Sequence, residues 1–218
     1  MPNENHAVLA VVLDESGSMA SQKDFVTKGF NKFLEEQQGV EEGEATLVRT
    51  AFNHEYPPKT ITESLDEASS LTEESYNPGG RTALFDAIGH TIDEIEDWMG
   101  NLPEGDQPDN VLVAIVTDGK ENSSEEYGLD QVRGRIENKQ DEGWEFMYIG
   151  AGLDDFSDPD EIGLKQNRSQ VRTNSTGYAQ AFNQVNTASL STRRKGTVGN
   201  YQEEAEKQMA EWNLDEDS

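Results

Sequence analysis

The sequence predicts a doubly wound α/β domain, with a mostly parallel central sheet, one antiparallel edge strand and helices on both faces. Three observations lead to this prediction. Continuous apolar runs rich in valine, such as residues 7–13 and 111–117, are typical of strands buried on both faces. Between such runs lie stretches whose apolar residues recur at helical spacing. The Pro57-Pro58 pair separates two short extended runs, as in an edge hairpin.

The predicted elements alternate along the chain. Strands are expected at residues 7–13, 45–53, 59–62, 111–117, 145–151 and 170–173. Helices are expected at residues 19–38, 82–100, 125–142 and 178–190, with short helices within 63–76 and 154–163. Residues 1–190 are therefore predicted to form one α/β domain. Residues 191–218 have fewer apolar side chains and are predicted to be a C-terminal tail with a short helix around 203–212.

The chain is strongly acidic. Its 44 Asp and Glu residues against 17 Lys and Arg residues give a formal net charge of −27. This charge disfavours nucleic acids and acidic membrane surfaces as partners, and it attracts cations and basic protein patches. Because salt screens such self-repulsion, a salt-loving (halophilic) host would explain the composition. An acidic protein of a mesophile or a phage is the alternative.

The sequence contains no cysteine, which excludes disulfides, thiolate metal sites and cysteine nucleophiles. The first residues lack a basic segment followed by an apolar stretch, and 18 apolar residues never occur in succession. Neither a signal peptide nor a transmembrane segment is therefore predicted. The expected location is the cytoplasm, or the virion if the protein is viral.

Three polar segments lie where open α/β sheets bind ligands, at the carboxyl ends of strands or in loops that reach them. Residues 14–18 (Asp-Glu-Ser-Gly-Ser) follow the first apolar strand, residues 79–82 (Gly-Gly-Arg-Thr) precede a helix, and residues 117–119 (Thr-Asp-Gly) end the second apolar strand. Alone, these segments are commonly a helix cap, a turn and a strand exit. Together, their carboxylate and hydroxyl oxygens predict a site for a hard divalent cation.

The segments VVLDESGSM, GGRTALFDAIG and IVTDGKEN resemble the three parts of the metal-ion-dependent adhesion site (MIDAS) of von Willebrand factor A (vWA) domains. The resemblance covers about residues 6–190, and no element of the five-residue pattern is missing. It implies that hydroxyls and carboxylates bind the ion, the carboxylates directly or through water. The implied hydroxyl ligands are Ser16, Ser18 and Thr82, and the implied carboxylates are Asp14 and Asp118. The implied ion is Mg²⁺, with Mn²⁺ or Ca²⁺ as further candidates.

The resemblance further implies a protein-binding module, not an enzyme, in which a Glu or Asp of a partner protein completes the coordination of the ion. Such a module would be an adaptor of a cellular complex, or an accessory or structural protein of a virus particle. The alternative is a metal-dependent hydrolase or phosphatase that uses Asp14 and Asp118. Against it, the sequence offers no recognisable second metal cluster, general base or nucleophile.

Other polar residues are given structural roles. Glu15 lies between the implied ligands and would either tune the ion or face solvent, and solvent is the favoured prediction. His6, His54 and His90 show no zinc-site spacing and are predicted to be structural. The basic cluster at residues 193–195 is expected to dock on the acidic domain itself or on a neighbouring molecule.

Overall fold

The computed structural model describes residues 3–41, 43–55, 57–151, 161–164, 168–171 and 175–195. The strands are β1 (Asn3–Asp14), β2 (Glu44–Phe52), β3 (Lys59–Ser64), β4 (Pro108–Thr117), β5 (Glu145–Ala151) and β6 (Arg168–Val171). The helices are α1 (Lys23–Gln38), α2 (Leu84–Gly100), α3 (Leu129–Asp141) and α4 (Ser175–Lys195), with 3₁₀ helices η1 (Gly17–Gln22) and η2 (Leu65–Glu67).

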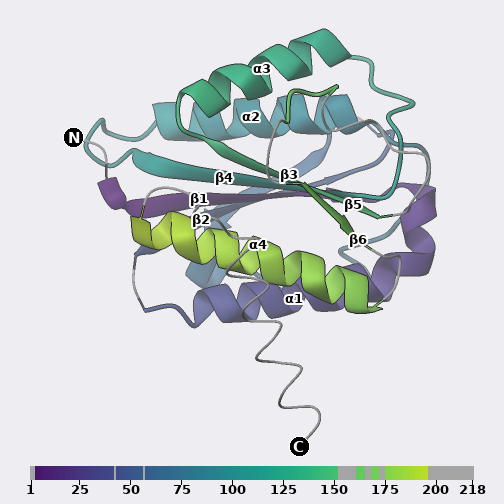
Figure 1. Cartoon of the computed structure of the whole chain (residues 1–218), viewed down its shortest axis with the longest axis horizontal. Coiled ribbons are helices and arrows are strands. Elements are labelled where there is room, and N and C mark those ends of the chain that lie inside the picture. Colours follow the sequence, from purple (N-terminus) through teal and green to yellow (C-terminus); the bar gives the residue numbers. More distant parts are fainter. Residues whose placement is uncertain are drawn as a thin grey trace, which may run out of the picture.

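The strands of the described residues form one six-stranded sheet in the order β3-β2-β1-β4-β5-β6 (Figure 1). Neighbouring strands are parallel, except that β2 and β3 pair antiparallel at one edge. The predicted fold class is therefore confirmed, including its antiparallel edge strand.

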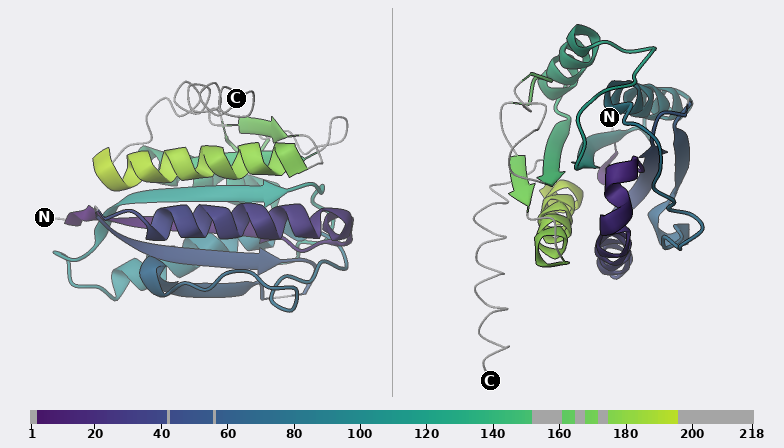
Figure 2. Two further views of the ribbon diagram at one scale, coloured as in Figure 1. Left: turned by 90° about the horizontal axis from the view of Figure 1, so that it is seen from below. Right: turned by 90° about the vertical axis from the view of Figure 1, so that its right-hand side faces the viewer.

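Helices cover both faces of the sheet. α1 and α4 lie on one face, and α2 and α3 lie on the other (Figures 1 and 2). The side chains of β1 alternate between the two apolar clusters, with Leu9 and Leu13 in one and Val8 and Val12 in the other. Because neither side of β1 faces solvent, its sequence is a continuous apolar run instead of an alternating one.

Three α-helices begin later than predicted. α1 begins at Lys23 and not at residue 19, because the 3₁₀ helix η1 precedes it. α2 begins at Leu84, so that Thr82 belongs to the preceding loop. α3 begins at Leu129 and not at residue 125, because the backbone amides of residues 125–127 donate hydrogen bonds to the carboxylate of Asp86. This carboxylate holds the segment as a loop that packs beside the start of α2.

The last helix ends later than predicted. α4 continues to Lys195, so residues 191–195 extend the helix beyond the predicted domain boundary. Arg193 is buried, and its guanidinium donates to the backbone carbonyls of Gln37 (2.7 Å) and Gly43 (2.6 Å). Arg193 of the basic cluster therefore docks on the domain itself, where it ties α4 to the connection between α1 and β2.

Some predicted elements fall partly or wholly outside the described residues. Of the short helix predicted at 154–163, residues 161–163 form a turn and the rest lies outside. The helix predicted at 203–212 lies wholly outside, and the last strand is observed at Arg168–Val171. Within the described part of the chain, no helix combines the length and apolar character needed to cross a membrane.

Gly29 allows α1 and α4 to pack closely. A Cβ atom at Gly29 would lie 2.3 Å from Cδ2 of Phe182. We expect Gly29→Ala to lower the free energy of unfolding by about 1–2 kcal/mol, because over-packing outweighs the gain in helix propensity. The matched control is Gly134→Ala in α3, where a Cβ atom meets nothing within 4 Å and a gain of about 1 kcal/mol is expected. Urea denaturation measures both, and a stabilised Gly29→Ala protein would contradict the packing argument.

Candidate metal centre

The carboxyl ends of β1 and β4 lie side by side. Leu13 of β1 pairs with Val116 of β4 in the parallel ladder, so the residues that follow them are neighbours at the same edge of the sheet. Those residues are Asp14 on one strand and Thr117 and Asp118 on the other. The central strand pair therefore brings the first and third predicted segments together.

Backbone hydrogen bonds bring the second segment to the same edge. The Gly17 amide donates to the carbonyl of Gly80 (3.0 Å), and the Gly79 amide donates to the carbonyl of Glu15 (2.7 Å). The Ala83 amide donates to the carbonyl of Asn53, at the end of β2 (3.0 Å). The loop before α2 is thus fixed against the loop after β1.

Asp14 is fully buried, and its carboxylate accepts a hydrogen bond on each oxygen. Oδ1 accepts from the Ser16 amide (2.6 Å), and Oδ2 accepts from the Thr117 hydroxyl (2.6 Å). Burial raises the pKa of Asp14 to about 6, although both hydrogen bonds oppose this rise, and the charge of Asp118 adds to it. The ionised form of Asp14 is therefore costly in the folded protein, and a nearby cation would relieve that cost.

Asp118 lies on the more open side of the site. Its Oδ1 accepts from the Ser18 hydroxyl (2.5 Å), and its Oδ2 accepts from the side-chain amide of Gln22. The hydroxyl oxygen of Ser18 is also 3.1 Å from that of Ser16. Burial raises the pKa of Asp118 against the opposing effect of the Ser18 and Gln22 hydrogen bonds. The hydroxyls of Ser18 and Ser16 thus connect Asp118 to the loop that begins at Asp14.

Thr82 is buried, and Asn122 fixes its backbone. The Thr82 amide donates to Oδ1 of Asn122 (3.0 Å), and the Asn122 amide donates to the Thr82 carbonyl (3.0 Å). A Cβ atom at Gly119 would lie 2.8 Å from Oγ1 of Thr82 and 3.3 Å from Oδ2 of Asp14. Because residue 119 is a glycine, it places no side chain against the Thr82 hydroxyl and the Asp14 carboxylate.

The structure thus brings the predicted site residues to one place at the edge of the sheet. These residues are Asp14, Ser16, Ser18, Thr82 and Asp118. The donors that the structure shows for the two carboxylates are all neutral: one backbone amide, two hydroxyls and one side-chain amide. Among the described residues, no ion pair includes either aspartate, and no three His, Asp or Glu side chains form a metal site. An ion here would therefore depend on hydroxyls as well as on two carboxylates.

Sequence reasoning assigned no role to five residues that support this site. Thr117 and Asn122 lie beside Asp118 in the sequence, so their proximity could have found them. Tyr76 donates its hydroxyl to the carbonyl of Asp14 (2.6 Å) from 62 residues away, and Gln22 reaches Asp118 from 96 residues away. The Tyr178 hydroxyl of α4 donates to Oε1 of Gln22. No local pattern marks these long-range contacts.

Glu15 is a correction to the sequence prediction. It was expected to face solvent, but its relative exposure is only 3%. Its Oε1 accepts a hydrogen bond from the Asn77 amide (2.8 Å), and its backbone carbonyl accepts the one from Gly79. Glu15 therefore holds the loop that delivers Thr82, and its buried contacts come from a segment that is remote in sequence.

The contacts of two histidines agree with structural roles. Nε2 of His6 lies 2.9 Å from the Thr46 hydroxyl. Nδ1 of His54 accepts a hydrogen bond from the Arg81 amide (3.4 Å), in the loop that carries Thr82. A Cβ atom at Gly80, where φ is +80°, would overlap the His54 ring. Glycine at this position therefore allows both the positive φ and the close approach of the His54 ring.

The family model of the von Willebrand factor type A domain matches residues 9–189. Similar solved structures include proximal thread matrix protein 1 from the mussel byssus, with 16% identity and a TM-score of 0.55 over 84% of this chain and 45% of that one. They also include a von Willebrand factor type A protein from Catenulispora acidiphila (15% identity, TM-score 0.55, 85% of this chain and 43% of that one). A third is the vWF domain of the type V pili tip protein Mfa5 from Porphyromonas gingivalis (9% identity, TM-score 0.61, 89% and 98%).

The chain spans less than half the length of the first two of these proteins, but nearly the whole of the Mfa5 domain. At identities of 9–16%, this likeness concerns the fold alone. No curated protein is significantly similar in sequence. The chemistry of the site must therefore be argued from its own residues.

Proposed function

Because the chain belongs to the von Willebrand factor type A domain family, we propose that it is a metal-dependent protein-binding module. In this proposal the ion is Mg²⁺ or Mn²⁺, with Ca²⁺ as a further candidate, and a Glu or Asp of a partner protein completes its coordination. The residues that hold the ion are Asp14, Ser16, Ser18, Thr82 and Asp118, the full set expected of a metal-ion-dependent adhesion site.

The observation that carries this proposal is the meeting of two carboxylates, bonded only to neutral donors in the described structure, with three hydroxyl-bearing residues. Carboxylate and hydroxyl oxygens suit hard cations, and Mg²⁺ is commonly held by one or two carboxylates with water in the remaining positions. The fully buried Asp14 has the most to gain from a positive charge, because burial penalises its ionised form.

An acidic partner residue fits the charge of such a site. Two carboxylates neutralise the two positive charges of the ion, and a hard ion then still accepts further oxygen ligands. The resident side chains would bind and orient the ion, which would supply the positive charge that attracts the partner's carboxylate. We propose a binding role and not an enzymatic one, acting as an adaptor of a cellular complex or as an accessory or structural protein of a virus particle.

The proposal is tested first with the metal alone. Calorimetric titration of the full chain with MgCl₂ and MnCl₂ is expected to show one binding site, which is lost in Asp14→Ala. The matched control is Asp97→Ala, which removes an exposed aspartate of α2. If the parent protein binds no divalent ion, or if Asp14→Ala binds it as well as the parent, the proposed site is wrong.

The binding role is tested next with a pull-down from cell extract in MgCl₂ and in EDTA. A partner that bridges through the ion is expected to be retained only with Mg²⁺ and only by proteins with Asp14 intact. Retention that is unaffected by both EDTA and Asp14→Ala would contradict the metal bridge. The hydrolase alternative is tested in parallel: phosphatase activity that requires the metal and disappears in Asp14→Ala would favour it over a binding module.

The charge of −27 sets a condition for both folding and binding. Repulsion between like charges on the surface has a range of about 10 Å at 0.1 M salt and about 3 Å at 1 M. We therefore propose that the protein is adapted to high salt, or that its partner presents basic residues around the bridging carboxylate.

Salt is accordingly expected to stabilise the chain. Between 0.1 M and 1 M KCl in EDTA, the melting temperature is expected to rise by at least about 4 °C, because salt screens the repulsion between the acidic side chains. For a domain of this size, such a rise corresponds to a gain of roughly 1–2 kcal/mol in the free energy of unfolding. Differential scanning calorimetry measures this shift, and sucrose without added salt serves as a non-ionic control. A melting temperature that stays constant or falls with KCl would contradict adaptation to salt.

A further inference from the structure

The start of α2 depends on another part of the chain for its cap. Its N-cap residue is Ala83, whose side chain cannot accept a hydrogen bond, so the first backbone amides of the helix need acceptors from elsewhere. The loop after β4 supplies two of them. Oε2 of Glu121 accepts from the Phe85 amide (2.9 Å), 36 residues away. The Ser124 hydroxyl accepts from the Asp86 amide (3.1 Å), 38 residues away. This loop therefore caps the helix from outside.

The helix holds the loop in return. Asp86, in the first turn of α2, is only 2% exposed, and its carboxylate accepts from three consecutive amides of the loop. Oδ2 accepts from the amide of residue 125 (2.8 Å), and Oδ1 accepts from those of residues 126 and 127 (3.0 and 2.8 Å). Hydrogen bonds from backbone amides to an ionised carboxylate are among the strong ones in proteins. Each segment thus supplies acceptors that the backbone of the other segment needs.

The carboxylate of Glu121 is fully engaged in this contact, although it lies only three residues after Asp118. Its Oε1 accepts from the amides of Ser123 (2.8 Å) and Ser124 (2.7 Å). Its Oε2 accepts from the Ser124 hydroxyl (2.6 Å) as well as from the Phe85 amide. A carboxylate offers about four lone-pair positions, and these donors fill them. Glu121 is therefore placed to hold the loop and not to bind an ion itself.

The joined segments carry two of the proposed metal ligands. Thr82 lies just before α2, and Asp118 lies just before the loop that caps it. Asn122 connects the two, because its Oδ1 accepts from the Thr82 amide (3.0 Å) and its own amide donates to the Thr82 carbonyl (3.0 Å). Hydrogen bonds in both directions thus join residues 82–86 to residues 121–127.

We propose that the carboxylates of Asp86 and Glu121 are positioning groups of the metal centre. They hold Thr82 and Asp118 as one unit, and this preorganisation raises the affinity of the site for its ion. The role rests on the proposed function, because only there are Thr82 and Asp118 ligands. Without the two carboxylates, the loops would have to be ordered at the expense of the binding energy of the ion.

Calorimetric titration of the full chain with MgCl₂ tests this role. Asp86→Ala and Glu121→Ala are each expected to weaken Mg²⁺ binding by about 10–100-fold. Asp86→Asn keeps an oxygen for the two amides on Oδ1 and is expected to lose less than Asp86→Ala. The matched control is Glu126→Ala, which removes an exposed carboxylate from the same loop and is expected to bind Mg²⁺ like the parent. Circular dichroism checks the fold of each variant, and Glu121→Ala carries the test if Asp86→Ala is unfolded.

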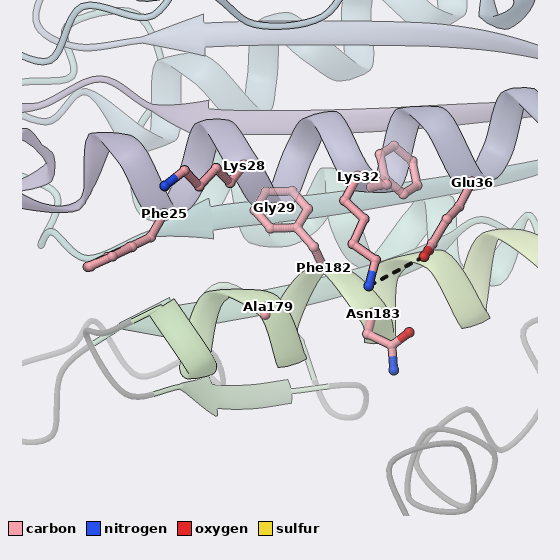
Figure 3. A pocket seen from close by; sticks show the side chains of 9 residues that line it. Phe25, Lys28, Gly29, Lys32, Glu36, Ala179, Phe182 and Asn183 are labelled. Atoms are coloured by element: carbon pink, nitrogen blue, oxygen red, sulfur yellow. Dashed lines mark ion pairs between the residues drawn. The ribbon is translucent and has the colours of Figure 1, made fainter. Parts of the chain in front are cut away.

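A second control separates positioning from a general loss of stability. Gly29→Ala acts between α1 and α4, where the added Cβ atom meets the Phe182 ring (Figure 3). This position lies on the other face of the sheet from α2. Gly29→Ala is therefore expected to be less stable than the parent but to bind Mg²⁺ equally well. An equal loss of affinity in Gly29→Ala and Asp86→Ala would overturn the positioning role.

Hydrogen exchange in EDTA gives a readout that needs no ion. Asp86→Ala is expected to exchange at least about tenfold faster than the parent at residues 125–127, and also faster at residues 82–86, because the two segments open together. Faster exchange confined to residues 125–127, or unchanged Mg²⁺ affinity in both alanine variants, would overturn the positioning role. A parent that binds no Mg²⁺ would instead contradict the proposed function, whatever the exchange shows.

Discussion

Asp14→Asn is expected to stabilise the metal-free protein at neutral pH and to abolish its stabilisation by Mg²⁺. The carboxylate is fully buried, and burial raises its pKa from 3.8 to about 6. This shift corresponds to a penalty of roughly 3 kcal/mol on the folded state when the group is ionised. Asparagine removes the charge and keeps an oxygen for the Ser16 amide, and the Thr117 hydroxyl can donate instead to the Gly119 carbonyl, 3.3 Å away.

The pH dependence follows from the direction of the shift. Above pH 6 the carboxyl group is ionised in both the folded and unfolded states, so the metal-free parent carries the whole penalty. As the pH falls from about 6 to 4, the folded protein takes up the proton first, and the penalty disappears. The advantage of Asp14→Asn in EDTA is therefore expected to be largest, about 3 kcal/mol, above pH 7 and close to zero near pH 4.

Mg²⁺ is expected to act in the opposite sense. At a free concentration 100 times its dissociation constant, the ion stabilises the parent by about 2.7 kcal/mol, whereas Asp14→Asn gains little because one ligand is lost. Urea denaturation at pH 7.5 and pH 4.5, in EDTA and in MgCl₂ at constant ionic strength, measures the free energy of unfolding of both proteins under these four conditions. Asp97→Asn removes the same charge from an exposed position of α2 and is expected to reproduce neither effect. A parent that is as stable as Asp14→Asn in EDTA at pH 7.5 would contradict the buried-charge argument.

The fold was largely predictable because its central strands have no solvent-facing side. Residues 7–13 and 111–116 are apolar throughout, and they form most of the middle strands β1 and β4 of the sheet. Helix ends were less predictable where side chains from elsewhere bind the backbone. Asp86 holds the amides of residues 125–127 and delays the start of α3, a contact between segments some 40 residues apart.

The same distinction applies to the candidate site. Asp14, Ser16 and Ser18 were recognisable because their spacing is local, and Asp118 because it ends an apolar strand. The burial of Glu15 and the contact between Gln22 and Asp118 depend on loops that meet only in the folded protein. Local spacing thus identified the oxygen atoms that could bind an ion, whereas the groups that hold them in place required the structure.

Gly119→Ala is expected to weaken Mg²⁺ binding while the fold remains intact. The added Cβ atom would lie 2.8 Å from Oγ1 of Thr82 and 3.3 Å from Oδ2 of Asp14, so the hydroxyl, the carboxylate or the loop must shift. Displacement of groups that orient metal ligands typically costs about 10–100-fold in affinity, and we expect a loss of this size in calorimetric titration with MgCl₂.

The matched control is Gly79→Ala, in the loop that carries Thr82, where a Cβ atom would meet nothing within 4 Å. It is expected to bind Mg²⁺ like the parent, and circular dichroism should show both variants folded. Unchanged affinity in Gly119→Ala would place the ion away from the space between Thr82 and Asp14, and would leave Asp118 and the two serines as its only proposed ligands. A selective loss in Gly119→Ala would instead show that the ion depends on all three loops. Residue 119 lies in the loop after β4, and its added carbon would contact Asp14 of the loop after β1 and Thr82 of the loop before α2.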